Sequence, residues 1–305
     1  MSLSLYNIRK WCKMFAGKSV YHTRQGVGKC FTDKAVRGYY NDLTTRVLMS
    51  PQLLDNDLLP KFKAENGIET YFPVEIVQFG LGAYDLFLLT GEDRYLDKFK
   101  QCVHWLKLQQ EESGAWDNFS FIYPDHPYSA MVQGECASLF VRAYMQTSDE
   151  AYLATARKAL LFMLKPLEEG GTARYIEKGL VLHEYTHWPA VLNGWVFAWW
   201  GLWDYVMITG DEDFRTAMEQ SAEALLCMLP DFSRHHWSMY ALNGRIASPH
   251  YHYIHIAQMT VMHQLTGRDE FVQYERLWRK WQNNLWYKSW AFVLKTYQKL
   301  TECND

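Results

Sequence analysis

Four segments of the chain concentrate residues that can transfer protons, hold charge or stack on flat rings. The side chains are Tyr, His, Trp, Glu and Arg, and the segments are 69–73, 114–128, 183–189 and 237–255. Each segment leads into an apolar stretch of helical length, so we expect all four at the same end of a helical scaffold, where loops usually carry sites. From them we take as candidates for substrate binding Tyr71, Trp116, Asn118, Arg245 and His252.

Three tyrosines in these segments, Tyr185, Tyr240 and Tyr251, suit proton transfer. A tyrosine beside Arg or His can have its phenol pKa lowered from about 10, because the opposite charge and hydrogen bonds stabilise the phenolate. Glu184–Tyr185, Tyr240 and Tyr251 offer such acids or bases from separate loops. This set favours removal of a proton beside a carboxylate and its return from the opposite face.

Two other chemistries compete for the same segments. His252 and His255 share a helix face and invite metal binding, but no nearby carboxylate completes a known ligand pattern, so we assign no metal and no cofactor. A glycoside hydrolase needs two carboxylates, and Glu184 with Asp117 or Glu75 keeps that alternative open.

Several function classes are disfavoured by motif and charge. The chain has no Gly-x-Ser-x-Gly motif, no cysteine in a basic context, no phosphate loop and no dinucleotide fingerprint. The net charge of −3 and the pI near 6.4 give no sign of nucleic-acid binding, so an anionic ligand must meet local basic groups. Aromatic residues make up 16%, with 13 Trp and 20 Tyr, which suits either sugar stacking or a large aromatic core.

A short pattern that recurs four times predicts the scaffold. It starts at Thr90, Thr147, Thr209 and Thr266, at spacings of 57, 62 and 57 residues. A Gly after an apolar helix suits its left-handed end, and the acidic residue that follows suits the start of the next helix. Apolar helices are expected before the turns, at 74–89, 129–146, 189–208 and 251–265. Amphipathic helices are expected after them, at 93–110, 150–163, 213–228 and 269–285.

This alternation predicts an all-α fold of inner and outer helices. We expect about four helical hairpins closed into an α/α toroid, with an open solenoid as the alternative. The expected organisation is an N-terminal extended arm at 1–70 with a short helix at Leu5–Phe15, a catalytic toroid at 71–290 and a tail at 291–305.

The sequence also favours a cytoplasmic bacterial enzyme. No basic stretch precedes a long apolar one at the N-terminus, as a secretory signal requires. The longest apolar segment, Val191–Ile208, is interrupted by polar residues and glycines, so we expect a core helix and no stable membrane insertion. The six scattered cysteines favour a reducing compartment.

Four ordered stretches resemble the C-terminal helical domain of the D-glucuronyl C5-epimerases, which convert glucuronic to iduronic acid in heparan-type chains. They are Tyr71–Leu81; Tyr128–Gly134 continuing to Val141–Tyr144; Glu184–Tyr185 with Val191–Gly194 and Gly201–Asp204; and Tyr251–His252 with His255–Ile256 and Gln258. They cover about 71–264, in family order and at near-family spacing.

The resemblance implies roles for particular residues. It makes Glu184, Tyr185 and Tyr251 catalytic, and a further family tyrosine is best matched by Tyr240. The arginine just after that tyrosine is absent, because Asn243 stands there, and Arg245 is the substitute. Gln133 and Asn193 lie in the shared motifs and join the candidates for substrate binding. The implied mechanism neutralises the uronate, removes the C5 proton on one face and returns a proton on the other.

The resemblance also sets the expected partners. It implies a uronic-acid polysaccharide such as heparosan, or an oligosaccharide of it, and a homodimer. The chain has no room for the β-rich domain that precedes the toroid in the animal enzymes, so the polymer and its sulfation stay open. A uronate lyase or hydrolase on the same scaffold, and a non-catalytic sugar-binding protein, are the competing interpretations.

Overall fold

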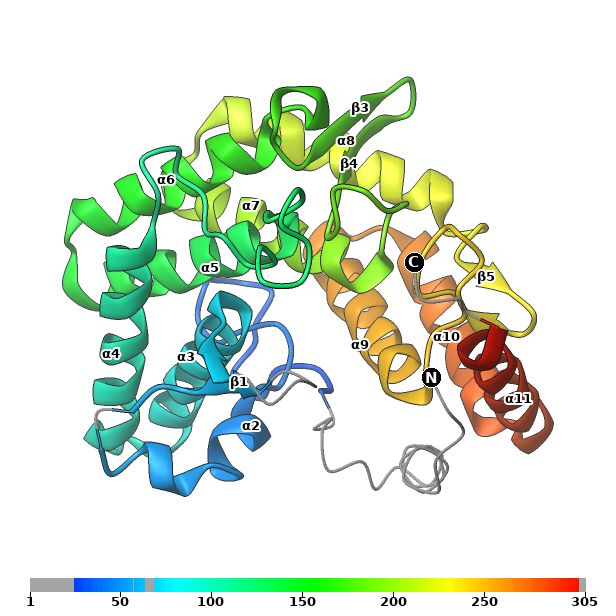
Figure 1. The fold of residues 1–305 in the computed structure, drawn as a ribbon, viewed down its shortest axis with the longest axis horizontal. Helices are drawn as coiled ribbons and strands as arrows, with labels where there is room; N and C mark the ends of the chain where they lie inside the picture. Colours follow the sequence, from blue (N-terminus) through cyan, green and yellow to red (C-terminus); the bar gives the residue numbers. More distant parts are fainter. Residues whose placement is uncertain (1–24, 57, 64–68, 302–305) are drawn as a thin grey trace. The chain divides into compact units, whose positions relative to one another are not determined.

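The computed structural model describes residues 25–56, 58–63 and 69–301, and the helix expected at Leu5–Phe15 lies outside them. Helices account for most of the described chain, which confirms the all-α prediction (Figure 1). The helices are α2 (Thr44–Leu48), α3 (Pro73–Thr90), α4 (Asp93–Gln109), α5 (Ala130–Thr147), α6 (Glu150–Leu164), α7 (Leu192–Thr209), α8 (Glu212–Met228), α9 (Pro249–Thr266), α10 (Asp269–Asn283) and α11 (Leu285–Thr301), with short 3₁₀ turns at Pro51–Leu53 and Leu167–Glu169.

The strands form three small antiparallel hairpins. These pair β1 (Lys61–Lys63) with β2 (Glu69–Tyr71), β3 (Ala173–Ile176) with β4 (Gly179–Leu182), and β5 (Ser233–Arg234) with β6 (Trp237–Ser238). The hairpins lie in the connections before α3, α7 and α9, so they shape the segments in which candidate residues are expected.

The four recurring turns have the predicted backbone. Helices α3, α5, α7 and α9 each end at a left-handed residue, at Gly91, Ser148, Gly210 and Gly267, with φ between 59° and 72°. In the second turn Ser148 takes the place of glycine, and the side chain of Asp149 accepts a hydrogen bond from the Ala151 amide at the start of α6. The prediction that each repeat ends one helix and begins the next is therefore confirmed.

The chain divides into two compact units, and each is described by itself. The large unit comprises residues 28–225, with α2 to α7 and most of α8. The small unit comprises residues 226–305 together with those up to Val27, and it contains β5, β6 and α9 to α11.

In the large unit, α5 and α7 pack side by side, with α6 against α5, and α3 packs against both α4 and α5 (Figure 1). A Cβ on Gly134 would lie 2.5 Å from the Ala198 Cα, and one on Gly201 would lie 2.4 Å from the Gly134 carbonyl oxygen. The two helices thus approach at a point where only glycine fits. The α7 indoles of Trp195 and Trp199 donate to α8, to Ser221 Oγ and the Met218 carbonyl, each at 2.8 Å.

A buried ion pair fastens the segment before α2 to this core. Arg142 on α5 and Asp204 on α7 are both fully buried and lie 2.6 Å apart. Arg142 also donates to the carbonyls of Arg37 and Gly38, and the Tyr40 hydroxyl donates to Asp204 Oδ1 at 2.5 Å. The part of the expected N-terminal arm that the structure describes is therefore held by specific hydrogen bonds.

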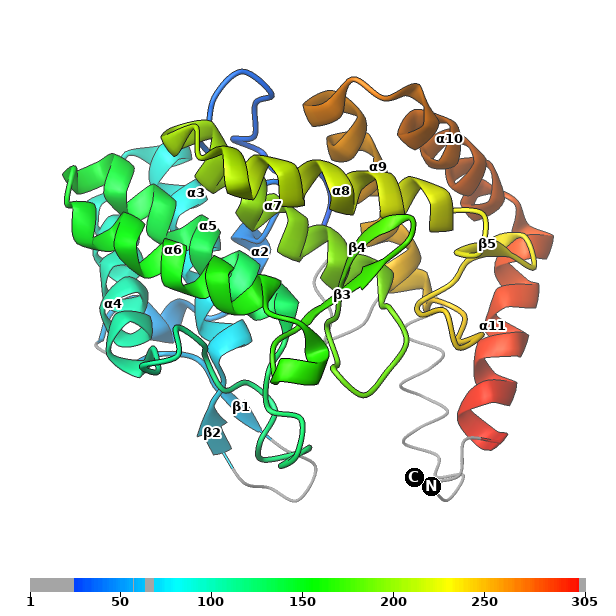
Figure 2. The same ribbon diagram turned by 90° about the horizontal axis from the view of Figure 1, so that it is seen from above.

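In the small unit, α10 packs against α9 on one side and α11 on the other (Figure 2). The β5–β6 hairpin contacts this layer, and Trp237 of β6 stacks on His252 of α9 with ring centroids 3.6 Å apart. Residues 291–301, which the prediction set apart as tail, continue α11. Within residues 25–56, 58–63 and 69–301, no helix is both long enough and apolar enough to cross a membrane.

Candidate functional site

The loop before α7 places Glu184 against the first turn of that helix. Glu184 is buried at 6% exposure, and a Cβ on Gly194 would lie 2.3 Å from Glu184 Oε2. Asn193, also buried, is the neighbouring residue of the same turn. The carboxyl group is thus set at the positive end of the α7 dipole, which stabilises negative charge.

Backbone hydrogen bonds of His183 fix the position of this loop. The His183 amide donates to the Thr172 carbonyl, and its own carbonyl accepts from the Ala130 amide at the start of α5, both at 2.9 Å. The ring Nδ1 lies 3.0 Å from the Trp188 carbonyl. Burial lowers the pKa of His183 to about 4, so the ring is neutral near pH 7 and donates to that carbonyl.

Tyr185 lies between two aromatic rings. Its ring stacks on Phe119 at 4.8 Å between centroids and contacts Trp188 at 4.9 Å. His126 Nδ1 joins the same two loops through Thr186 Oγ1 at 3.0 Å. The segments 114–128 and 183–189 therefore form one aromatic surface beside Glu184, as the shared position before α5 and α7 predicts.

A second buried acid, which the sequence did not single out, belongs to this end of the large unit. Glu135 on α5 is fully buried and accepts from Gln78 Nε2 on α3 at 3.0 and 3.3 Å. Burial raises its pKa to about 8; the Gln78 hydrogen bond and Arg46 lower it, and the carboxylates of Glu184 and Glu75 raise it. Glu135 is therefore mostly protonated near pH 7. The only sequence signal is an acidic residue in a helix expected to be buried, and that helix also carries Gln133 and Arg142.

The candidates near the starts of α3 and α5 mostly support the scaffold. Trp116 is fully buried, and its Nε1 donates to the Leu106 carbonyl at 2.7 Å. The Gln133 amide exchanges two hydrogen bonds with the Trp116 backbone, each at 3.2 Å. Asn118 Oδ1 accepts from the Val74 amide at the start of α3 at 3.1 Å. Tyr71 is 41% exposed, with Lys61 Nζ 5.2 Å from its ring centroid. Of these four residues, Tyr71 alone presents a ring to solvent.

The small unit brings Tyr240 and Tyr251 together. Their ring centroids lie 4.8 Å apart, and both side chains are half-buried. The Tyr240 amide donates to the Arg245 carbonyl at 2.7 Å, which closes the loop between these residues. The Nζ of Lys295 on α11 lies 5.9 Å from the Tyr240 ring centroid. Lys295 lies in the segment expected to be a tail, so no sequence motif connects it with this pair.

His252 follows Tyr251 on α9 and is engaged on both ring nitrogens. Nδ1 lies 2.8 Å from Ser238 Oγ, and Nε2 lies 3.1 Å from the Trp278 carbonyl. Ser238 Oγ also lies 2.8 Å from His255 Nδ1. Burial lowers the pKa of His252 to about 3, so the ring is neutral. Both ring nitrogens form hydrogen bonds that hold α9 against its neighbours. A metal ion bound by His252 would have to replace one of these hydrogen bonds.

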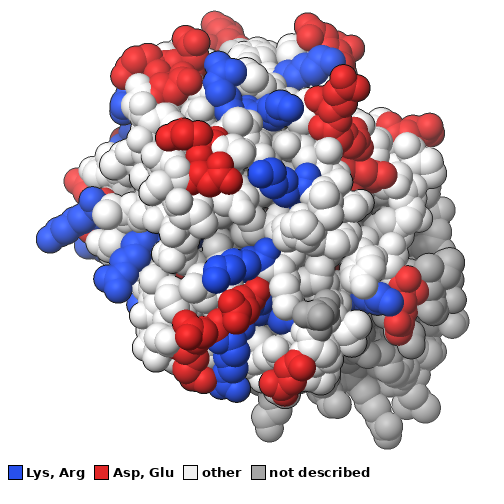
Figure 3. All heavy atoms as spheres, turned by 90° about the vertical axis from the view of Figure 1, so that its left-hand side faces the viewer, with Lys and Arg blue, Asp and Glu red and all other residues white. Residues whose placement is uncertain are grey.

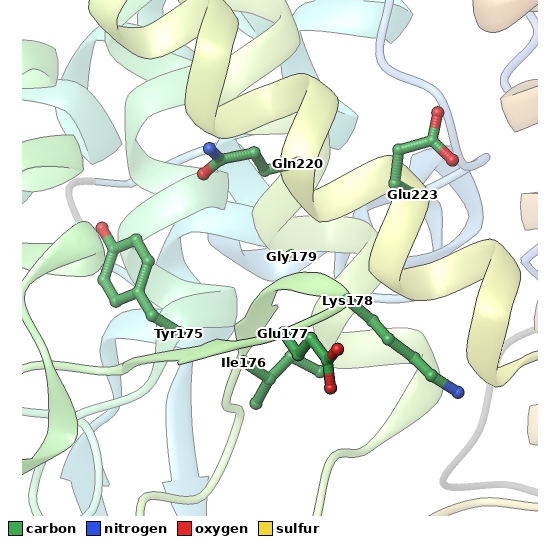
Figure 4. Close-up of a pocket in the computed structure, with 7 residues that line it drawn as sticks. All are labelled: Tyr175, Ile176, Glu177, Lys178, Gly179, Gln220 and Glu223. Carbon is green, nitrogen blue, oxygen red and sulfur yellow. The ribbon is translucent and has the colours of Figure 1, made fainter.

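A shallow pocket elsewhere in the large unit contains none of the candidate residues. It lies between the β3–β4 hairpin and α8 and has a volume of about 350 Å³ (Figure 4). It is lined by Tyr175, Ile176, Glu177, Lys178, Gly179, Gln220 and Glu223. Its mixed charges form no set that points to a particular ligand.

Positive and negative side chains are mixed over the described part of the face that Figure 3 shows. The net charge of the chain is −3. A negatively charged substrate would therefore depend on individual basic side chains near the reacting groups.

Comparison with known proteins assigns the family. A sequence model described as D-glucuronyl C5-epimerase C-terminus matches residues 123–280, just over half of the chain. The chain belongs to this family. The matched segment contains Glu184, Tyr185, Tyr240 and Tyr251, and it ends before α11.

Two curated relatives match part of the chain. An uncharacterised protein of Methanocaldococcus jannaschii is 28% identical over 157 residues, which are 50% of this chain and 51% of that protein. The D-glucuronyl C5-epimerase of Caenorhabditis elegans is 27% identical over 146 residues, which are 43% of this chain and 24% of that enzyme. The chain thus matches about half of the first relative and about a quarter of the second.

A solved structure supports the fold class. Cellobiose 2-epimerase from Spirochaeta thermophila superposes with a TM-score of 0.54 at 8% identity, covering 92% of this chain and 86% of that one. At that identity the likeness shows the fold alone, and the fold is the predicted α/α toroid class of paired helices.

Proposed function

We propose that the protein is a carbohydrate epimerase that inverts C5 of D-glucuronic acid residues in a heparosan-like polysaccharide. The family match over residues 123–280, with Glu184, Tyr185, Tyr240 and Tyr251 inside it, is the observation that carries the proposal. The buried setting of Glu184 and the contact between Tyr240 and Tyr251 support it.

In the proposed reaction the carboxylate of the sugar is neutralised, which acidifies the C5–H bond. A base removes the proton, and the negative charge spreads into the carboxylate as an enolate-like intermediate. A phenol then delivers a proton to the opposite face of C5. Glu184, Tyr185 and Tyr251 are the proposed acid and base groups. Each product molecule takes one proton from the enzyme and, through it, from the solvent.

Solvent exchange gives a direct test. Incubation with heparosan in D₂O should place deuterium at C5 of the uronic acid residues, measured by NMR or mass spectrometry of the digested polymer. Glu184→Gln and Tyr251→Phe should lower the exchange rate by about 10²- to 10⁴-fold, the usual contribution of an acid or base. Glu177→Gln and Tyr297→Phe, at exposed positions outside the set of candidate residues, are the matched controls. Absence of deuterium in every uronic polymer tried would reject the proposal.

A hydrolase is the second candidate, and Glu135 is the observation that favours it. A carboxyl group protonated near pH 7 beside a second carboxylate is the arrangement that glycoside hydrolysis uses. The same incubation distinguishes the reactions. A hydrolase would create reducing ends, a lyase would create ultraviolet-absorbing unsaturated uronate, and an epimerase would create neither. A non-catalytic sugar-binding protein would give no product and no exchange.

A further inference from the structure

Helix α11 fastens the loop that carries Tyr240 and Arg245. The Ile246 amide donates to Gln298 Oε1 at 2.9 Å, and Gln298 Nε2 donates to the Gly244 carbonyl at 2.7 Å. Lys295 Nζ donates to the Ile246 carbonyl at 2.9 Å. Three hydrogen bonds from one helix thus determine where this short loop lies.

One of these contacts also brings a positive charge to the tyrosine pair. The Lys295 ammonium lies 5.9 Å from the Tyr240 ring centroid, and the Tyr240 ring contacts Tyr251 at 4.8 Å. At this range a cation stabilises negative charge on a phenol or on a carboxylate placed beside it. The hydrogen bond to the Ile246 carbonyl holds the ammonium there.

The proposed reaction needs a cation in this neighbourhood. Removal of a proton beside a carboxylate requires the negative charge to be neutralised, and the net charge of the chain does not provide a general positive field. Asn243 stands where the family resemblance places an arginine. Arg245 is in the same loop, and Lys295 reaches the loop from α11, beyond the end of the family match at residue 280.

We propose that Lys295 is the specificity-determining cation of this site, with its ammonium group binding the carboxylate of the uronic acid beside Tyr240 and Tyr251. The assignment rests on the proposed function and identifies the group that recognises its substrate class. Lys295 selects acidic over neutral sugars, and α11 becomes part of the site.

The test compares two ligands that differ in one group. A glucuronate-containing heparosan oligosaccharide and its carboxyl-reduced counterpart, in which glucose replaces glucuronic acid, are titrated calorimetrically into the full-length protein. Wild type should prefer the acidic ligand. Lys295→Gln should weaken acidic binding by about 10- to 100-fold, as expected for a lost charged hydrogen bond, and leave neutral binding within about 2-fold. Lys295→Arg should restore most of the preference, because it keeps the charge.

Three further variants separate this role from simpler ones. Gln298→Ala weakens the loop fastening and keeps the charge, so it should affect both ligands equally. Arg245→Gln tests the competing cation. Lys280→Gln, on the exposed side of α10, is the matched control. Equal weakening of both ligands by Lys295→Gln, or loss of acid preference in Arg245→Gln alone, would overturn the assignment.

Deuterium exchange measured on the same variants keeps the two proposals apart. A wild-type protein that prefers the acidic ligand through Lys295 but exchanges no deuterium rejects the epimerase and retains the carboxylate site. A protein that exchanges deuterium while Lys295→Gln keeps its acid preference rejects the role of Lys295 and retains the epimerase.

Discussion

Helix α5 carries a fully buried acid and a fully buried base that have very different partners. Glu135 and Arg142 are seven residues apart, two helical turns, and so lie on the same side of the helix. Arg142 is paired with Asp204 at 2.6 Å and donates to three backbone carbonyls. Glu135 has an amide partner in Gln78, and burial, with a further contribution from the carboxylates of Glu184 and Glu75, raises its pKa.

The difference in partners suggests that Arg142 belongs to the scaffold and Glu135 to the site. A buried charge whose partners are all present fixes one arrangement of the chain. A buried acid beside further acids is costly for folding, and such groups gather where function requires them. The Arg142 end joins α5, α7 and the segment before α2, whereas the Glu135 end lies with the Glu184 loop.

The largest effect is expected from breaking the paired end. Arg142→Met should lower the free energy of unfolding by about 3–5 kcal/mol, because Asp204 is left as an uncompensated buried charge. Urea denaturation near pH 7 measures the change. The double variant with Asp204→Leu should recover a large part of the loss, since it removes both charges. A loss below about 1 kcal/mol in the single variant would show that the pair does not fasten this end.

The acidic end should be sensitive to a single added methyl group. Gly194→Ala places a Cβ 2.3 Å from Glu184 Oε2, so the carboxyl group must move. We expect a loss of about 1–3 kcal/mol in stability from overpacking. Deuterium exchange should fall about 10²-fold, the cost of displacing a reacting group by about 1 Å.

A double-mutant cycle tells whether that loss acts through Glu184. In the Glu184→Gln background, Gly194→Ala should cause little further loss of exchange, because the displaced group is already inactive. Additive losses would mean that Gly194 affects activity by a route independent of Glu184. Stability measured on all four proteins keeps unfolding separate from loss of activity.

The two ends also differ in what the sequence could reveal. The turns at Gly91, Gly210 and Gly267 were predictable, because a left-handed helix end depends on the local residue. Trp116 and Gln133 lie in predicted segments, but the hydrogen bonds of the Gln133 side chain with the Trp116 backbone depend on tertiary packing.

Contacts between residues far apart in the sequence could not be predicted from the motifs. Lys295 meets Tyr240 across 55 residues, and only the path of α11 brings them together. The role of Glu135 was similarly hidden, because its pKa depends on burial by α3 and on the Glu184 loop. The roles of Glu184, Tyr185, Tyr240 and Tyr251 in catalysis stay predictions for the exchange experiment.

The smallest effect is a dependence on pH that Glu135 should impose. In the unfolded chain its carboxyl has a pKa near 4.5, and in the folded protein the pKa is about 8. Between these values the unfolded state has lost a proton that the folded state still holds, so the free energy of unfolding falls as pH rises. Glu135→Gln should remove this fall and gain at least about 1.4 kcal/mol relative to wild type between pH 5 and pH 8.5, the equivalent of one pKa unit.

Activity distinguishes Glu135 from a buried acid at the other end. Above pH 8 an ionised Glu135 adds negative charge near Glu184, so KM for a uronate substrate should rise in wild type and stay flat in Glu135→Gln. Charges that act on Glu135 from the surrounding elements are Arg46, Glu75 and Glu184, with Tyr39 and Cys136 nearby.

Asp85→Asn is the matched control. Burial raises the pKa of Asp85 to about 7, so its replacement should also flatten the stability profile. It should leave the KM profile unchanged, because Asp85 bonds the Tyr39 amide at the Arg142 end. Identical KM profiles for wild type and Glu135→Gln would show that Glu135 is a structural acid like Asp85 and has no part in substrate binding.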